Sequence, residues 1–251
     1  MNIMFSKLFY KKVRSSLPNI PPNPTQWPKA WSMIFFKEYP RFDAVSLPRE
    51  MLPLKNLKEV LFERRSTREC DASQSISLEE LSTLLYYSAG IKCEPGEYTE
   101  SNQEERNSTR RFYPSGGARY PLEMYVDVRR VSGVEPGVYH YNLLNHSLEK
   151  LLSKDAEENT IAASVLASWT KDSAVVFIIT GVQGRNAIKY GDFGYDMLAT
   201  ESGHMSQNLH LLGASLGMKY CPLFGFNNEE IHKTLDARED ELILYVTAMG
   251  K

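Results

Sequence analysis

Apolar side chains recur at helical spacing in two parts of the chain. Leucine or alanine at 78, 81, 84, 85 and 89 predicts a helix with one apolar face. Ser77 and Glu80 have the spacing of a capping box at its start, and Gly90 marks its end. A second stripe predicts a long helix over 197–216, ended by a glycine at 217; its members are Leu198, Met205, Leu209, Leu212 and Leu216.

Apolar runs of other kinds predict strands. Residues 123–128 alternate, and 138–141 and 147–152 are rich in β-branched, aromatic or leucine side chains. The continuous run 174–180 reads as a buried central strand, and 241–248 as a last strand. Helices and strands mix without a regular βαβ repeat, so the predicted class is α+β.

Three segments do not fit this regular pattern. Residues 14–53 are rich in proline and aromatic side chains, which predicts a non-helical arm lying on its own domain; a PxxP ligand for a partner is the alternative. The predicted division is an arm at 1–56 and a main domain at 57–251. Residues 1–13 are expected to be a packed or frayed segment rather than an amphipathic surface helix. The charged stretch 92–111 is either disordered or a functional lid.

Composition and charge exclude several classes of protein. Of 251 residues, 42% are hydrophobic and 24% are charged, as in ordinary soluble domains. A net charge of -2 gives no field that would gather nucleic acid. The run 174–180 is far shorter than the roughly 20 residues of a membrane span, and 1–13 lacks the apolar core of a secretion signal. The three cysteines are widely spaced, which indicates a reducing cytoplasm, and the histidines lack metal-ligand spacing.

Two motifs suggest a binding site. Residues 64–68 read RRSTR, and forked guanidinium donors beside hydroxyls suit a phosphate, although a solvated basic turn has the same composition. Residues 113–123 read YPSGGARYPLE, in which a glycine pair lets the backbone approach a flat ligand; a tight β-turn is the alternative. The G-x-S-x-G sequence at 213–217 closes a predicted helix, so it is not read as a hydrolase elbow.

These motifs belong to a longer series. GVYHYN at 137–142, KYGDFGY at 189–195, ESGHMSQN at 201–208 and CPLFGF at 221–226 follow in order. With RRSTR and YPSGGARYPLE, they resemble the nitroreductase-like FMN flavoproteins. The nearest branch is the SagB-type dehydrogenases, which oxidise thiazolines and oxazolines to thiazoles and oxazoles in ribosomal peptide toxins. The resemblance implies a dimeric, nitroreductase-like fold with a mixed, mostly antiparallel sheet flanked by helices.

The resemblance also implies roles for individual residues. Arg64, Arg65 and Ser66 would anchor the FMN phosphate and ribityl chain, and Arg68 would lie near flavin N1 and the C2 carbonyl. The ring system would meet Pro114, Ser115, Gly116 and Gly117, from the second subunit. The turn of Leu223, Phe224 and Gly225 would direct an amide at flavin N5, and Gln207 would add a polar contact. Many nitroreductases close over the phosphate with basic residues beyond the last strand; here Lys251 or Arg119 would substitute, or the 64–68 cluster would act alone.

Lys189 and Tyr190 match the pair assigned the base role in azoline oxidases. Either residue would remove the Cα proton of the azoline, and a lysine serves as a base only if its pKa is lowered. The alternative is a junction lysine beside a packing tyrosine. The implied partners are a second copy of the chain, a precursor peptide and a cyclodehydratase complex. Two other functions stay open: an NAD(P)H-dependent flavin reductase of nitro, quinone or enone substrates, and an FMN-binding scaffold subunit.

Overall fold

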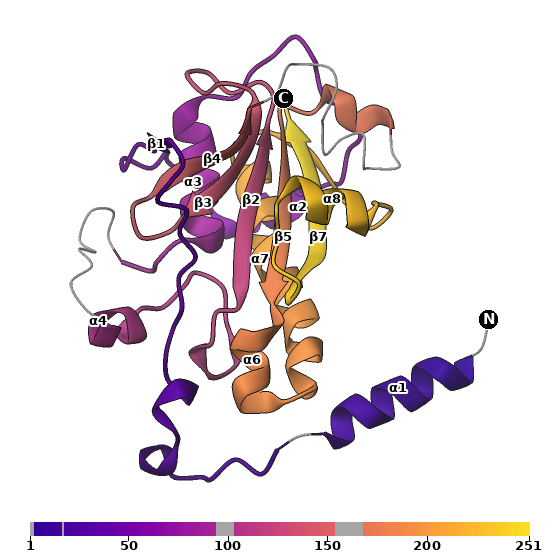
Figure 1. Ribbon diagram of the computed structural model, residues 1–251. Coiled ribbons are helices and arrows are strands. Elements are labelled where there is room, and N and C mark those ends of the chain that lie inside the picture. The colour runs from indigo at the N-terminus through magenta and orange to yellow at the C-terminus, as the bar shows by residue number, and fades with distance from the viewer. Residues whose placement is uncertain (1–2, 17, 94–102, 154–167) are drawn as a thin grey trace.

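A seven-stranded sheet forms the centre of the molecule (Figure 1). The computed structural model describes residues 3–16, 18–93, 103–153 and 168–251. The strand order is β1-β4-β3-β2-β5-β7-β6, and every pairing between these strands is antiparallel. The strands are β1 (Ala44–Ser46), β2 (Leu122–Val128), β3 (Gly137–Asn142), β4 (Ser147–Ser153), β5 (Val175–Val182), β6 (Lys219–Leu223) and β7 (Glu241–Gly250).

The helices keep the labels of Figure 1. They are α1 (Ile3–Ser15), α2 (Leu57–Glu63), α3 (Leu78–Ala89), α4 (Gln103–Ser108), α6 (Gln183–Tyr190), α7 (Phe193–Ser215) and α8 (Asn228–Thr234). Short 3-10 turns cover Pro24–Gln26, Lys29–Trp31, Gly116–Ala118 and Ser168–Asp172. Together with the sheet they give the predicted α+β class.

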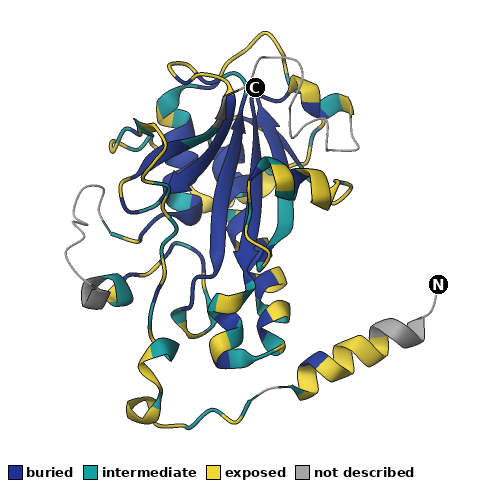
Figure 2. Cartoon of the chain, viewed as in Figure 1, coloured by how far each residue is buried: buried dark blue, intermediate teal, exposed yellow. Residues whose placement is uncertain are grey.

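Helices α3 and α7 cover one face of the sheet, α8 and part of the N-terminal segment cover the other, and the strands between them are buried (Figure 2). On one face, Leu84 of α3 and Leu209 of α7 pack with Val126 and Phe177 of the central strands. On the other face, Tyr125 and Ile178 pack with Ile231 of α8 and with Tyr39 of the N-terminal segment. Strands β2 and β5 are buried along their whole length, so they form the rigid centre on which the site is built.

Most predicted elements are confirmed. Ser77 and Glu80 form the capping box of α3, and Gly90 is its C-cap. The long helix is α7, and Gly217 follows it at a φ of +69°. The predicted strands correspond to β2, β3, β4, β5 and β7. Helices α2, α6 and α8 and strand β6 were not predicted from the sequence.

The N-terminal part needs two corrections. Residues 3–15 form a helix, α1 (Figure 1), so the expectation of a frayed segment was wrong, whereas that of a packed one holds: Arg14 pairs with Asp196 of α7, and the Phe9 ring lies 6.2 Å from that of Tyr195. The segment 14–53 is not wholly non-helical, because it holds the end of α1, two 3-10 turns and β1. It does lie on its own domain: Ile34 is buried, and Lys37 forms an ion pair with Glu241.

The described residues bear on only part of three further expectations. Of the charged stretch 92–111, residues 94–102 lie outside the described residues, and α4 occupies 103–108. Within the described part of the chain, no helix has both the length and the apolar character for a membrane span. The same residues hold no cluster of His, Cys, Asp and Glu suited to a metal ion.

Candidate active site

The glycine motif forms a tightly folded turn before β2. Gly117 has a φ of +62°, and Ala118 and Tyr120 also take left-handed values of 51° and 47°. The Tyr120 amide donates a hydrogen bond to the Ser115 hydroxyl, 2.9 Å away. A non-glycine residue held in this region costs about 1–3 kcal/mol and persists where its surroundings fix it. The turn is therefore a candidate functional element.

A buried carboxylate of α7 holds this turn. Gly116 donates its amide hydrogen to Glu201 Oε1 over 3.1 Å, and the Glu201 residue is only 3% exposed. Its second oxygen has no hydrogen-bond partner among the described residues. Burial raises the Glu201 pKa to about 7, against the opposing effect of hydrogen bonds from Ser115 and Gly116. Glu201 is therefore poised to change its charge near neutral pH.

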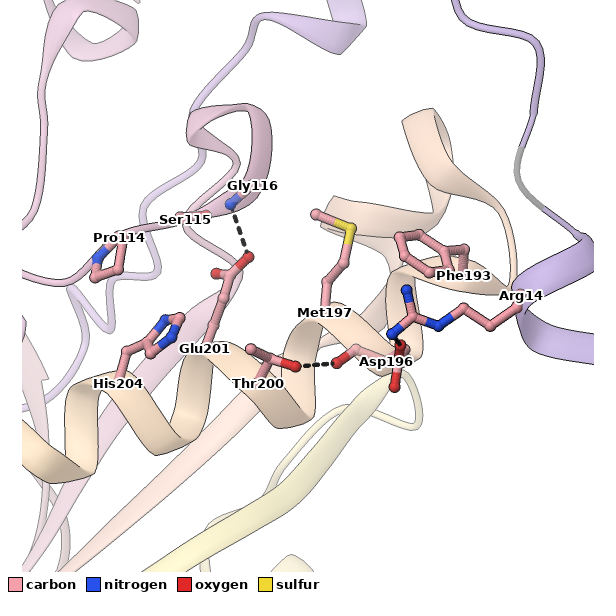
Figure 3. Close-up of a pocket in the computed structure, with 10 residues that line it drawn as sticks. All are labelled: Arg14, Pro114, Ser115, Gly116, Phe193, Asp196, Met197, Thr200, Glu201 and His204. Atoms are coloured by element: carbon pink, nitrogen blue, oxygen red, sulfur yellow. Dashed lines mark hydrogen bonds and ion pairs between the residues drawn. The ribbon is translucent and has the colours of Figure 1, made fainter. Parts of the chain in front are cut away.

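A pocket of about 480 Å³ opens beside this contact (Figure 3). Its walls come from the glycine turn, from α7 and from the end of α1. In Figure 3, the Glu201 side chain reaches from α7 toward Gly116, with His204 on the same helix beside it. The lining residues are Arg14, Pro114, Ser115, Gly116, Phe193, Asp196, Met197, Thr200, Glu201 and His204.

Lys189 and Tyr190 reach the same turn from the end of α6. A Cβ added to Gly117 would lie 2.3 Å from Tyr190 Oη and 3.2 Å from Lys189 Nζ. Glycine is required there both by this space and by the positive φ. The structure thus brings the predicted pair together with the predicted glycine turn.

The surroundings of the pair act on both pKa values. Burial lowers the pKa of Lys189, and the nearby Arg119 guanidinium lowers it further. Burial raises the pKa of Tyr190, which Arg119 opposes and Glu201 supports. Lys189 is only 2% exposed, and no acceptor among the described residues forms a hydrogen bond or ion pair with its amine. An amine in this setting is suited to accept a proton.

The basic cluster lies where α2 ends. Arg64 is the C-cap of α2, and Arg65, Ser66 and Arg68 are exposed. Among the described residues, none of these three arginines forms an ion pair. A pocket of about 410 Å³ is lined by Ser66, Thr67, Arg68, Glu69 and Cys221. The Thr67 hydroxyl is buried without a hydrogen-bond partner in the described part of the chain. Unpaired guanidiniums beside an unsatisfied hydroxyl fit a phosphate group.

Two proposed substitutes for the phosphate anchor are engaged elsewhere. Lys251 pairs with Glu80 at the start of α3. Arg119 is fully buried and donates to the backbone carbonyls of Ala30, Trp31 and Arg185. Both side chains therefore already have partners, which favours the 64–68 cluster acting alone, while a role for Lys251 or Arg119 at the phosphate stays a prediction.

The glycine turn and the basic cluster lie against different parts of helix α7. The turn contacts Glu201, whereas Arg64 lies close enough to His210 that burial and this guanidinium lower the His210 pKa to about 4. From the rise per residue, these two helix positions are about 14 Å apart. Gln207 is exposed between them.

The remaining predicted FMN contacts lie at the end of β6. Leu223 ends the strand, and Phe224, beside Gly225, is 73% exposed.

Comparisons with known proteins identify the family. The model of the nitroreductase family matches residues 61–251. The chain belongs to this family. MJ1384 of Methanocaldococcus jannaschii, which is named as a nitroreductase, is 35% identical to this chain over 188 residues. The match covers 75% of this chain and 88% of that protein. Members of the nitroreductase family bind FMN, and a nitroreductase from Exiguobacterium sibiricum in complex with FMN shares the fold, with a TM-score of 0.54 at 14% identity over 80% of this chain and 90% of that one.

Two relatives of this nitroreductase are named for toxin processing. The trifolitoxin-processing protein TfxB of Rhizobium leguminosarum bv. trifolii is 29% identical over 78% of this chain. The microcin B17-processing protein McbC of Escherichia coli is 30% identical over 51% of it. The matched regions are about half of each relative, 52% and 49%. A chain of the microcin synthetase McbBCD complex with truncated pro-MccB17 bound shares the fold over 98% of this chain and 91% of its own, with a TM-score of 0.60 at 19% identity.

Sequence reasoning missed Glu201 as a site residue. Glu201 falls on the apolar stripe of α7, three residues after Leu198 and four before Met205, all three buried. A carboxylate on a buried helical stripe is the signal that could have identified it, because such groups are rarely buried without a partner.

Proposed function

We propose that this nitroreductase is an FMN-dependent oxidase that dehydrogenates peptide thiazolines or oxazolines to thiazoles or oxazoles during maturation of a ribosomal peptide natural product. The observation that carries the proposal is the buried Lys189 amine, which has no acceptor among the described residues and lies with Tyr190 against Gly117. The names of TfxB and McbC support a role in the processing of a peptide toxin.

FMN would be held by two sets of residues that fit it. Arg64, Arg65 and Ser66 would bind the phosphate and ribityl chain, with Arg68 toward the ring. The ring system would lie against the turn at 114–117, with the backbone at 223–225 on its other side. When bound, FMN supplies the acceptor for a hydride from the azoline Cβ.

The residues of this chain would manage the proton of that reaction. Lys189, in its neutral form, would take the Cα proton, and Tyr190 would orient the ring; the reverse assignment uses the same geometry. The lowered pKa of Lys189 increases the neutral fraction at neutral pH. Burial of the amine disfavours its charged form, so a larger share of Lys189 is unprotonated and able to accept the proton.

We also propose a homodimer. The turn and the cluster are separated along α7, so a second subunit would complete each FMN site. Leu57, Leu61 and Phe62 on α2 are 64%, 55% and 84% exposed, which is unusual for large apolar side chains and suits an interface. A precursor peptide and a cyclodehydratase complex are the further proposed partners. Cys70, Cys93 and Cys221 are free thiols, in keeping with the proposed cytoplasmic location.

Single substitutions test the proposed oxidase. Lys189→Ala and Tyr190→Phe should lower azole formation by about 10²–10⁴-fold, the usual effect of losing a general base, while the flavin spectrum stays intact. Peptide mass spectrometry measures the reaction, because each ring loses two hydrogens. Lys233→Ala, at a side chain 72% exposed, is the control and should react at the wild-type rate. Wild-type rates in both site variants would remove the pair from the mechanism.

One alternative function has its own support. MJ1384, which this chain matches over 88% of its length, is named as a nitroreductase, and this favours an NAD(P)H-dependent reductase. Steady turnover of NADH with a nitroaromatic or a quinone, faster than azoline oxidation by the same preparation, would establish that alternative. A third outcome, ring formation by a cyclodehydratase that needs the chain but not its bound flavin, would indicate a scaffold subunit.

A further inference from the structure

The N-terminal arm covers the candidate base. The centroid of the Trp27 ring lies 3.5 Å from Lys189 Nζ, and the Trp31 ring lies 5.9 Å from it. Trp27 is fixed within the arm, because its indole nitrogen donates to the Pro21 carbonyl over 2.7 Å. The two indole rings are themselves neighbours, 6.3 Å apart. The arm thus presents an aromatic wall to the amine.

A buried arginine fastens this wall to the domain. Arg119 Nη1 donates to the carbonyls of Ala30 and Trp31 over 3.2 and 2.7 Å, and its Nε donates to Arg185 of α6 over 3.0 Å. The Arg119 side chain is fully buried, and no acid in the described part of the chain forms an ion pair with it. A buried cation without an ion pair is costly, and three carbonyl acceptors offset part of that cost here.

We propose that Trp27 and Arg119 are positioning residues for Lys189, and that the arm is a wall of the active site which keeps the amine dry and without an anionic partner. This inference rests on the proposed role of Lys189 as the base. It assigns a function to residues of the arm that lie far from Lys189 in the sequence.

The charged groups around the amine favour its neutral form. Arg119 faces it from the turn before β2, Tyr190 lies beside it on α6, and Glu201 of α7 acts on Tyr190 from the far side of the turn. Against this amine, the described part of the arm places aromatic rings and no acid. Contact with an indole face stabilises a cation much less than its hydration does, so the net effect of the wall is to disfavour the ammonium.

The test measures the protonation of Lys189 directly in the full-length protein as purified. Lysines are labelled with ¹³C at Cε, the Lys189 signal is assigned by its absence in Lys189→Arg, and its shift is followed against pH. In the wild type, this signal should titrate below those of the exposed lysines. Trp27→Ala should admit water and raise the Lys189 pKa, lowering the neutral fraction at pH 7 about tenfold, whereas Trp27→Phe should stay close to the wild type.

Arg119→Gln removes the neighbouring positive charge and should move the Lys189 titration in the same direction. If that variant does not fold, Trp27→Ala decides the matter alone, because Trp27 is half-buried and lies in the arm. An unchanged Lys189 titration in Trp27→Ala would overturn the proposal.

The pH profile of azoline oxidation separates this inference from the proposed function. In Trp27→Ala, the pH profile should shift to higher pH together with the Lys189 titration measured by NMR. A shifted titration in a protein that does not oxidise azolines would leave the positioning role standing and remove the oxidase. Azoline oxidation with an unshifted Lys189 titration would leave the oxidase standing and remove the positioning role.

Discussion

The amide of Gly116 donates a hydrogen bond to the carboxylate of Glu201, and this contact joins the glycine turn to the long helix α7. The same carboxylate faces the pocket of about 480 Å³ and has a pKa raised to about 7 by burial. A change in its charge therefore occurs at the base of the turn that carries Gly117 and meets Lys189 and Tyr190.

Protonation of Glu201 should make stability depend on pH. Its folded pKa, about 7, lies above its ordinary value of 4.5, so the folded state binds the proton more tightly. This contribution to stability is present below pH 4.5 and declines as the pH rises through 7, by an amount on the order of 3 kcal/mol. Glu201→Gln keeps the acceptor for Gly116 but removes the titration. Urea unfolding at pH 5 and 8 should show that this variant gains stability relative to the wild type at the higher pH. An equal difference at both pH values would contradict this prediction.

Loss of Arg64 should weaken FMN binding. The Arg64 guanidinium has no ion pair among the described residues and is available to the phosphate. Arg64→Ala should cost about 1.5–3 kcal/mol, the range for a hydrogen bond to a charged group, which is on the order of 10–150-fold in Kd. Quenching of flavin fluorescence on titration measures this constant. Arg238→Ala, at an exposed arginine paired with Asp240, is the matched control and should leave the Kd unchanged. Equal Kd values for both variants would exclude the cluster from the phosphate site.

A charge on the exposed face of α2 should disrupt the proposed homodimer. Phe62 is 84% exposed in the isolated chain, and a stable dimer interface would bury it in a surface above about 2,000 Å² in total. Phe62→Glu should give a monomer with reduced FMN content, since each site would lose its second subunit. Light scattering coupled to gel filtration reports both mass and flavin absorbance. A wild-type monomer that retains FMN would refute the dimeric site.

Local signals accounted for much of the fold. The capping box at Ser77 and the glycine after α7 act over a few residues, so they can be read from the sequence. Strand β6 was missed because it holds Pro222, which normally argues against a strand. It is tolerated because β6 lies at the edge of the sheet, where an amide can go without a ladder partner. Helix α6 was missed because it has few apolar side chains and packs on the arm and on α7.

The site was predictable as motifs but not as an assembly. The family resemblance indicated Lys189 and the glycine turn, and the structure places them in contact. No local pattern places Trp27 of the arm over Lys189, because that contact depends on the course of the whole chain. Arg119 was expected near a phosphate because its charge was visible in the sequence, whereas its burial against backbone carbonyls was not.

A second buried charge cluster lies on the sheet face that the arm covers. His140 is fully buried, with Nδ1 2.8 Å from Glu149 and Nε2 3.1 Å from Glu123. Glu123 is also paired with Arg185 over 2.6 Å, and the Tyr39 amide of the arm donates to Glu149. Both ring nitrogens face carboxylate oxygens, an arrangement that favours the imidazolium because it can donate to both. Burial lowers the His140 pKa, but the two carboxylates outweigh this effect, and the net pKa is raised.

Removal of this imidazolium should destabilise the protein strongly. His140→Gln leaves two buried carboxylates with less compensation, and breaking such a cluster costs about 3–5 kcal/mol. Because the folded pKa of His140 lies above its ordinary value of 6.5, the stabilisation is complete below pH 6.5 and is lost as the pH rises through the folded pKa. Urea unfolding should therefore show a larger difference between wild type and variant at pH 6 than at pH 9. His232→Gln, at the end of α8 where the ring contacts the Arg238 carbonyl, is the control and should change little at either pH. A small loss in His140→Gln that is the same at both pH values would mean that the ring is neutral, and that the two carboxylates share protons of their own.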